Sequence, residues 1–136
     1  MRYEPYEDEY KAVPLLNKQQ LIEYFLLRIY ETEEVWGLKE KASEWMTYEF
    51  NGQLRLPIFA YKRYADDATT GDWEIMIPIA ESMEFFMERT LPRLHEKNVC
   101  LEIMPREQGT GHIVTAQQLL SILEGLIDSG EYKMEG

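Results

Sequence analysis

The sequence predicts an α+β domain in which a mainly antiparallel sheet of about five strands packs against three main helices. Apolar residues recur at helical spacing in three segments, and an Asn51-Gly52 dipeptide separates two runs rich in β-branched and aromatic residues. The helical and strand patterns come in separate blocks along the chain. This arrangement favours an α+β fold over a doubly wound α/β fold.

The length and composition predict a single compact domain. A chain of 136 residues can bury one sizeable core, and 45% hydrophobic residues are too many for a disordered chain. No repeat, linker or composition break divides the sequence. We therefore assign residues 14–128 to one domain, residues 1–13 to an acidic N-terminal arm, and residues 129–136 to a C-terminal tail.

The first predicted helix follows Asn17. Asn17 is a typical N-cap residue, and Gln20, three positions later, completes a capping box. The apolar side chains that follow share one stripe, which should face the core: Leu21, Ile22, Phe25, Leu26 and Ile29.

The Asn51-Gly52 dipeptide predicts a β-hairpin with a type I′ turn. The turn sets the register, so that Phe50 lies opposite Gln53 and Trp45 lies opposite Ile58. A strand over residues 35–38 is expected to pair with this hairpin and form a short meander.

The middle of the chain predicts a short helical turn and loop over residues 61–73. The stretch "WEIMIPI" that follows is either a further strand or an extended connection. A second long helix is predicted over residues 80–96, with a bend at Pro92 because proline cannot donate a helical hydrogen bond.

Two strands and a helix complete the predicted fold. The stretches "NVCLEIMP" and "GHIVT" have strand character and are joined through the glycine-rich residues 109–111. Thr115 and Gln118 form a second capping box, which predicts that the last helix begins there.

The formal charge of −11 excludes some partners and favours others. A chain with 25 acids and 14 bases repels phosphate backbones and anionic lipid surfaces, so we expect neither a nucleic-acid ligand nor a membrane. A basic protein would be attracted. The same charge also keeps a small protein soluble, and that role alone is the alternative.

The sequence also predicts a cytoplasmic location. The first residues lack the apolar segment of a secretory signal, and no apolar run approaches the ~18 residues that a membrane span needs. Cys100 is the only cysteine, which excludes an intramolecular disulfide and fits a reducing compartment.

No motif predicts catalysis or a cofactor. Cys100 beside His95 or His112 would resemble a nucleophile and base, but Cys100 lies in an apolar strand pattern typical of an inert buried thiol. Two separate histidines and one cysteine do not supply a zinc site. We therefore expect no cofactor and favour a protein that is not an enzyme.

The acidic loop after residue 65 resembles a calcium loop only in part. Asp66 and Gly71 match its first and sixth positions, but Ala68 and Ile77 replace the oxygen ligands of its third and twelfth positions. Solvated acids at a turn explain the loop better, so no metal site is predicted.

Acidic and aromatic residues predict a surface for a basic partner, because aromatic rings beside carboxylates suit lysine and arginine. Its candidate residues are Asp66, Asp67, Asp72, Trp73 and Tyr61, together with Glu7, Asp8 and Glu9 of the N-terminal arm. An alternative site is an apolar pocket between sheet and helix, lined by Trp36, Trp45 and Tyr48.

The opening stretch "YEPYEDEY" combines tyrosines and carboxylates around Pro5. Pro5 and charge repulsion predict a solvated or loosely docked arm. The alternative is a segment that folds onto a cationic surface only when it binds, with the tyrosine rings supplying contact area.

Several stretches resemble a known family. They are "EEVWGL", "LPIFAYKRYA", "GDWE", "FFMERTLPRLHEKNVCLEIMP" and "VTAQQLLSIL". Together they resemble the small bacterial proteins grouped as domain of unknown function 2750, over about residues 15–127. The resemblance implies turns and core anchors at these motifs and carries over no activity, cofactor or catalytic residue. The acidic arm and the tail lie outside it.

Three functions follow as hypotheses. The leading one is a non-enzymatic protein-binding module for a basic partner, in its narrowest form an immunity-type inhibitor of a cationic toxin. The second is a small-molecule binding or enzymatic domain that uses the apolar pocket. The third is a homodimer formed through exposed aromatic residues or a sheet edge.

Overall fold

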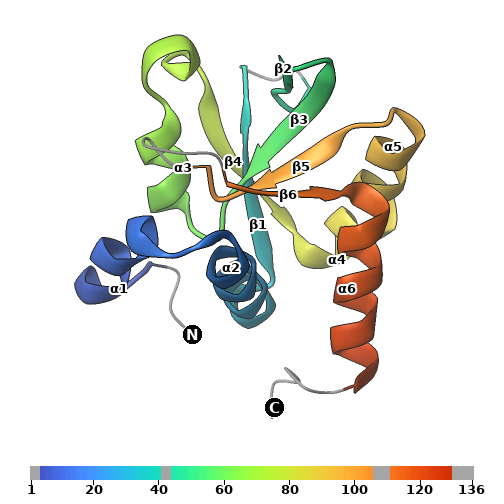
Figure 1. Ribbon diagram of the computed structural model, residues 1–136, viewed down its shortest axis with the longest axis horizontal. Coiled ribbons are helices and arrows are strands. Elements are labelled where there is room, and N and C mark those ends of the chain that lie inside the picture. Colours follow the sequence, from blue (N-terminus) through green and yellow to red (C-terminus); the bar gives the residue numbers. More distant parts are fainter. Residues whose placement is uncertain (1–3, 41–43, 106–110, 130–136) are drawn as a thin grey trace.

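The computed structural model describes residues 4–40, 44–105 and 111–129. It confirms the α+β class (Figure 1). The strands of the described residues are β1 Glu34–Lys39, β2 Tyr48–Phe50, β3 Gln53–Ile58, β4 Ile77–Ser82, β5 Cys100–Ile103 and β6 His112–Thr115. The α-helices are α1 Glu7–Ala12, α2 Lys18–Thr32, α3 Lys62–Ala68, α4 Met83–Phe85, α5 Leu91–Glu96 and α6 Ala116–Ser129.

The strands form two sheets, where the sequence predicted one sheet of about five strands. Within the described ranges, β1 pairs with β4, and a four-stranded sheet has the order β2-β3-β5-β6. Most pairings are antiparallel, as predicted, but β3 and β5 are parallel. Parallel strands need a long crossover, and the chain between β3 and β5 supplies it with α3, β4, α4 and α5.

Local signals in the sequence identified α2 and the hairpin correctly. The Asn17 side chain accepts a hydrogen bond from the Gln20 amide at 2.8 Å, and the Gln20 side chain accepts one from the Asn17 amide at 3.0 Å. In the hairpin, Asn51 has φ 52° and Gly52 has φ 79°, as a type I′ turn requires, and Phe50 lies opposite Gln53.

The predicted pairing of Trp45 with Ile58 is wrong. Trp45 forms a β-bridge with Lys39 of β1, and the Met46 amide donates to the Leu38 carbonyl at 2.8 Å. The chain before Tyr48 therefore leaves the hairpin for β1, which limits β2 to three residues.

The predicted meander, in which β1 pairs with the hairpin, is wrong. β1 instead pairs with β4 and makes only isolated bridges to the chain around the hairpin. One edge of β1 pairs with β4 over six residue pairs. On its other edge, Trp36 and Phe59 exchange two backbone hydrogen bonds of 3.0 and 2.8 Å. β1 therefore ties the two-stranded sheet to the end of β3, and the "WEIMIPI" stretch contributes a strand, β4, rather than a connection.

The helix predicted from residue 80 begins at Met83, because Ala80 still pairs with Trp36 in the β1–β4 ladder. The Ser82 side chain caps the helix by accepting from the Phe85 amide at 3.1 Å. A π-helical turn, Phe86–Thr90, joins α4 to α5 directly before Pro92. The wider turn accommodates the proline, which agrees with the predicted distortion.

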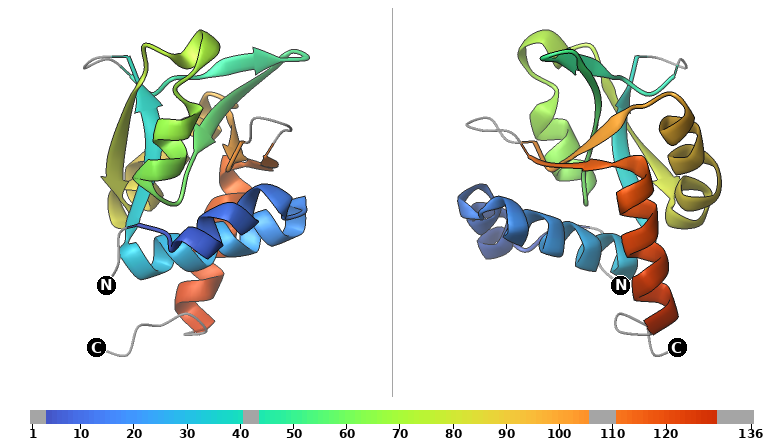
Figure 2. Two further views of the ribbon diagram at one scale, coloured as in Figure 1. Left: turned by 90° about the vertical axis from the view of Figure 1, so that its left-hand side faces the viewer. Right: turned by 45° about the vertical axis from the view of Figure 1, so that its right-hand side comes forward.

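The core lies between one face of the four-stranded sheet and the helices α2, α5 and α6. Figure 2 shows α2 and α6 on the same side of this sheet. The sheet contributes Leu56, Ile58, Leu101 and Ile103, all almost fully buried. The helices contribute Leu21, Phe25 and Ile29 from α2, Leu91 and Leu94 from α5, and Leu119 and Leu123 from α6.

Residues 4–13 of the acidic N-terminal arm lie against α2 and α3, so the structure has the docked form of the arm that the sequence predicted to be solvated or loosely docked. Residues Glu7–Ala12 form α1. The Tyr10 ring stacks on Tyr64 of α3 with 5.7 Å between centroids, and Val13 is buried. Tertiary contacts therefore outweigh the charge repulsion and Pro5. The predicted tail lies outside the described residues except for Ser129, where α6 ends.

Gly37 of β1 provides a test of this packing. A β-carbon added at Gly37 would lie 2.7 Å from Cζ3 and 2.9 Å from Cε3 of Trp45. Gly37→Ala should therefore lower the free energy of unfolding by about 1–3 kcal/mol, because the indole must move. Gly125→Ala, where nothing lies within 4 Å, should raise it by about 0.5–1 kcal/mol.

Urea unfolding of both variants measures these changes. In a protein that already carries Trp45→Leu, Gly37→Ala should lower the free energy of unfolding by less than it does in the wild type. Equal costs with and without the indole would show that Trp45 does not impose glycine at this position.

Candidate functional site

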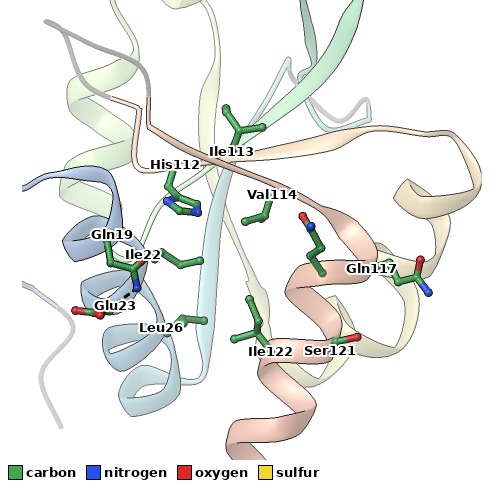
Figure 3. Close-up of a pocket in the computed structure, with 11 residues that line it drawn as sticks. Gln19, Ile22, Glu23, Leu26, His112, Ile113, Val114, Gln117, Ser121 and Ile122 are labelled. Atoms are coloured by element: carbon green, nitrogen blue, oxygen red, sulfur yellow. Dashed lines mark hydrogen bonds between the residues drawn. The ribbon is translucent and has the colours of Figure 1, made fainter.

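The candidate site is a groove of about 760 Å³ between α2 and α6, with β6 along one side (Figure 3). Apolar side chains form its floor and polar side chains its rim. The apolar lining consists of Ile22, Leu26, Ile113, Val114 and Ile122, and the polar lining of Gln19, Glu23, His112, Gln117, Gln118 and Ser121. We call this the α2–α6 groove.

The α2 wall follows from the helical spacing of its residues. Ile22 and Leu26 lie one turn apart on the buried stripe, so the edge of the core stripe becomes the floor of the groove. Gln19 and Glu23 are exposed at the rim, where the Gln19 amide donates to the Glu23 carboxylate at 3.1 Å. Gln19 and Glu23 therefore form an exposed polar pair on α2 beside the groove.

The α6 wall begins at the predicted second capping box, which the structure confirms. The Thr115 hydroxyl accepts from the Gln118 amide at 3.0 Å, and the Thr115 amide donates to the Gln118 side-chain oxygen at 2.9 Å. The box fixes the direction in which α6 leaves β6. Gln117 and Ser121, one turn apart, therefore face the groove with Ile122.

His112 on β6 has its orientation fixed by α2. Its Nδ1 lies 3.0 Å from the Lys18 carbonyl oxygen. A carbonyl can only accept, so Nδ1 donates in this hydrogen bond. The groove therefore combines the His112 ring with the Glu23 carboxylate and glutamine amides.

The charges in the groove are unbalanced. Among the described residues, its lining contains one carboxylate, Glu23, and no lysine or arginine. An apolar floor, hydrogen-bonding amides and a single negative charge suit a ligand that combines apolar and cationic groups.

Most acidic residues of the predicted surface form hydrogen bonds or ion pairs within the protein. Glu7 forms an ion pair with Arg63 at 2.9 Å, and Asp66 forms one with Lys62 at 2.8 Å. Asp67 accepts from the Tyr10 hydroxyl. These pairs join α1 to α3 or support α3 itself, so their charges are partly neutralised before any partner arrives.

The remaining residues of that predicted surface are divided between interior and exterior. Glu9 accepts from the Tyr24 hydroxyl and lies 3.6 Å from Arg28. Tyr61 is buried, with 1% of its surface exposed, so it cannot present its ring to a partner. Asp8 and Asp72 are exposed.

Trp73 packs against Tyr48 rather than standing free. Their ring centroids lie 5.5 Å apart, and the Tyr48 hydroxyl donates to the buried carboxylate of Glu102. The second oxygen of Glu102 accepts from the Gly111 amide at 3.0 Å. This cluster joins β2, β5 and the start of β6, and it satisfies a carboxylate that is only 2% exposed.

The three residues of the predicted apolar pocket do not line one cavity, because Tyr48 lies apart from Trp36 and Trp45. Trp36 and Trp45 line a common gap of about 10 Å³, which is smaller than one water molecule needs. Tyr48 lies on β2, in the cluster with Glu102. Space for a ligand exists instead in the α2–α6 groove.

The titratable residues singled out from the sequence lie on separate elements. Cys100 is half-buried on β5, His95 is exposed near the end of α5, and His112 is bonded to α2. Among residues 4–40, 44–105 and 111–129, no three histidine, cysteine or acidic side chains are grouped to hold a metal ion. No helix in these ranges is long and apolar enough to cross a membrane.

Sequence reasoning missed the groove as a site. The only local signals are polar residues that flank apolar stripes, at Gln19 and Glu23 in one helix and at Gln117 and Ser121 in another. Nearly a hundred positions separate the two walls, and no periodicity within either helix indicates that they face each other.

The fold and the groove define a small α+β domain with an open groove at one edge of its larger sheet. The family model for proteins of unknown function (DUF2750) matches residues 22–123, so the chain belongs to this family. This match confirms the resemblance found in the sequence. It includes most of the groove and excludes α1. A search of curated proteins found no match.

Three tyrosines, of which Tyr64 is buried and Tyr24 and Tyr48 are half-buried, predict how stability depends on pH. Burial raises the pKa of Tyr48 to about 12, aided by its hydrogen bond to Glu102, and burial raises the pKa of Tyr64 to about 12. Burial and hydrogen bonds to Glu9 and Tyr64 raise the pKa of Tyr24 far above its usual range. These phenols hold their protons more tightly in the folded state than in the unfolded state.

The free energy of unfolding should therefore be unaffected by these groups below pH 10 and should fall as the pH rises towards about 12. Urea unfolding at successive pH values measures the fall. Tyr64→Phe removes one of the groups, so its curve should fall less steeply than that of the wild type. Parallel curves would contradict the assignment.

Proposed function

We propose that this protein is a cytosolic, non-enzymatic binding module that holds a basic segment of a partner protein in the α2–α6 groove. The observation that carries the proposal is the lining of the groove. In the part of the chain that the structure describes, it combines an apolar floor with one carboxylate and no basic side chain. A lysine or arginine side chain contributes both an apolar stem and a charge, which this lining can accept.

The charge of the whole chain supports the same partner. A formal charge of −11 attracts cations over long range and raises the association rate of a basic protein. The acids of α1 and α3 are largely paired within the protein, so the remaining acids supply most of this field. The proposed contact therefore lies at the groove instead.

The shape of the groove favours a protein segment over a small molecule. Its lining side chains come from α2, β6 and α6 only, and no described element closes the side away from β6 (Figures 1 and 3). Small-molecule sites usually enclose most of their ligand. A groove that is open along two helices can accommodate a chain that continues beyond it.

The narrowest form of the proposal is an immunity-type inhibitor of a cationic toxin. Such a toxin would be one member of the class of basic partners, and charge complementarity is the feature that supports it. A neighbouring gene that encodes a basic toxin domain would favour this form over other basic partners.

A peptide titration followed by amide NMR spectra tests the proposal. The probe is a synthetic peptide of about six alternating valine and lysine residues, the common length of a strand. Binding of the peptide should shift the resonances of groove residues, and added salt should lower the affinity of the peptide. A valine-glutamate peptide of the same length should cause no shifts.

Charge-reversal variants locate the binding surface. Glu23→Lys places a cation at the rim and should weaken the valine-lysine peptide by about fivefold. Glu96→Lys makes the same charge change at the exposed end of α5 and should lower the affinity for the peptide less. Equal effects, or resonance shifts confined to α1 and α3, would contradict binding in the groove.

A further inference from the structure

The groove runs along the free edge of a sheet. In the described part of the chain, β6 is the last strand of the order β2-β3-β5-β6, with β5 on one side only. Three consecutive residues of β6, His112, Ile113 and Val114, line the groove. Successive side chains of a strand point to opposite faces, so a groove that reaches all three follows the edge of the strand.

The hydrogen bonds of β5 show which backbone groups of β6 face this edge. The Met104 amide donates to the Ile58 carbonyl of β3 at 2.9 Å. Backbone groups alternate in direction along a strand, so those of Leu101 and Ile103 point away from β3, towards β6. Their partners are Val114 and His112.

Val114 and His112 therefore use their backbone groups towards β5. The residue between them, Ile113, directs its N–H and C=O outwards, into the groove. An outward pair of donor and acceptor on an edge strand is the template to which another strand can add.

The two ends of this edge are already occupied. The Thr115 amide donates to Gln118 in the capping box, and the Gly111 amide donates to Glu102. The available backbone groups therefore centre on Ile113. A segment that adds here must be short, because α6 begins directly after Thr115.

We propose that the partner binds by adding a short extended segment to β6, hydrogen-bonded to the backbone of Ile113. This inference rests on the proposed function and specifies its mode. Alternate residues of the segment face the floor made by Ile22, Leu26 and Ile122 and are apolar. The residues between them point to the other face of the sheet and are lysine or arginine, which the negative field of the chain attracts.

Proline at position 113 tests the backbone contact. Ile113→Pro removes only the outward N–H and leaves the hydrogen bonds of His112 and Val114 to β5, as prolines at sheet edges do. The variant should bind the valine-lysine peptide about tenfold more weakly than the wild type. Ile113→Ala retains the N–H, and its affinity for the peptide should fall by less than about threefold.

A second measurement uses the wild-type protein and does not depend on how the variant folds. Two valine-lysine peptides are N-methylated, one on the valine amides and the other on the lysine amides. Strand addition predicts that only one of them loses binding, because alternate amides face β6. Equal affinities of the two methylated peptides would overturn the inference.

The outcomes separate the mode from the function. If the unmethylated peptide binds the groove but neither Ile113→Pro nor methylation discriminates, strand addition is wrong and the proposed function stands. If no valine-lysine peptide binds the groove, both are wrong. Binding of the peptide with discrimination in both measurements supports both.

Discussion

The parallel pairing of β3 with β5 is the constraint on which the rest of the structure depends. It aligns Leu56 with Leu101 and Ile58 with Ile103, four side chains that are almost fully buried at the centre of the core. A parallel pair needs a crossover, and here the crossover places β4 on the far edge of β1 and α5 against α6. Because β5 is paired on its other edge with β6, the sheet ends at β6, beside the two helices that form the groove. The core and the binding surface thus have a common origin.

The negative charge of the chain serves two purposes in this arrangement. Carboxylates of α1 and α3 hold the N-terminal helix in place through Arg63, Tyr10 and Tyr24, and Glu102 ties the hairpin to the start of β6. The remaining acids set the long-range field. The proposed surface for a basic partner therefore lies where an apolar floor and the free edge of a strand occur together within that field. The density of acids in the sequence does not locate it.

Sequence reasoning succeeded where a feature is determined by neighbouring residues. Both capping boxes and the Asn51-Gly52 turn depend on contacts within four positions, and all three were predicted. It failed where a feature depends on distant partners. Trp45 was assigned to the wrong strand because its partner Lys39 lies outside the hairpin. Whether the arm is solvated or docked was left open, because Tyr10 contacts Tyr64 only in the folded protein. The groove belongs to the same class, since its walls are separated by most of the chain.

The exchange rate of the Ile113 amide hydrogen tests the central claim most directly. This amide faces the groove at the free edge of β6, whereas that of Val114 is bonded to β5 and serves as an internal reference. With the valine-lysine peptide at saturation, exchange at Ile113 should slow by about tenfold or more, because the amide becomes hydrogen-bonded to the added strand. Unchanged exchange at Ile113 in the saturated complex would contradict the account.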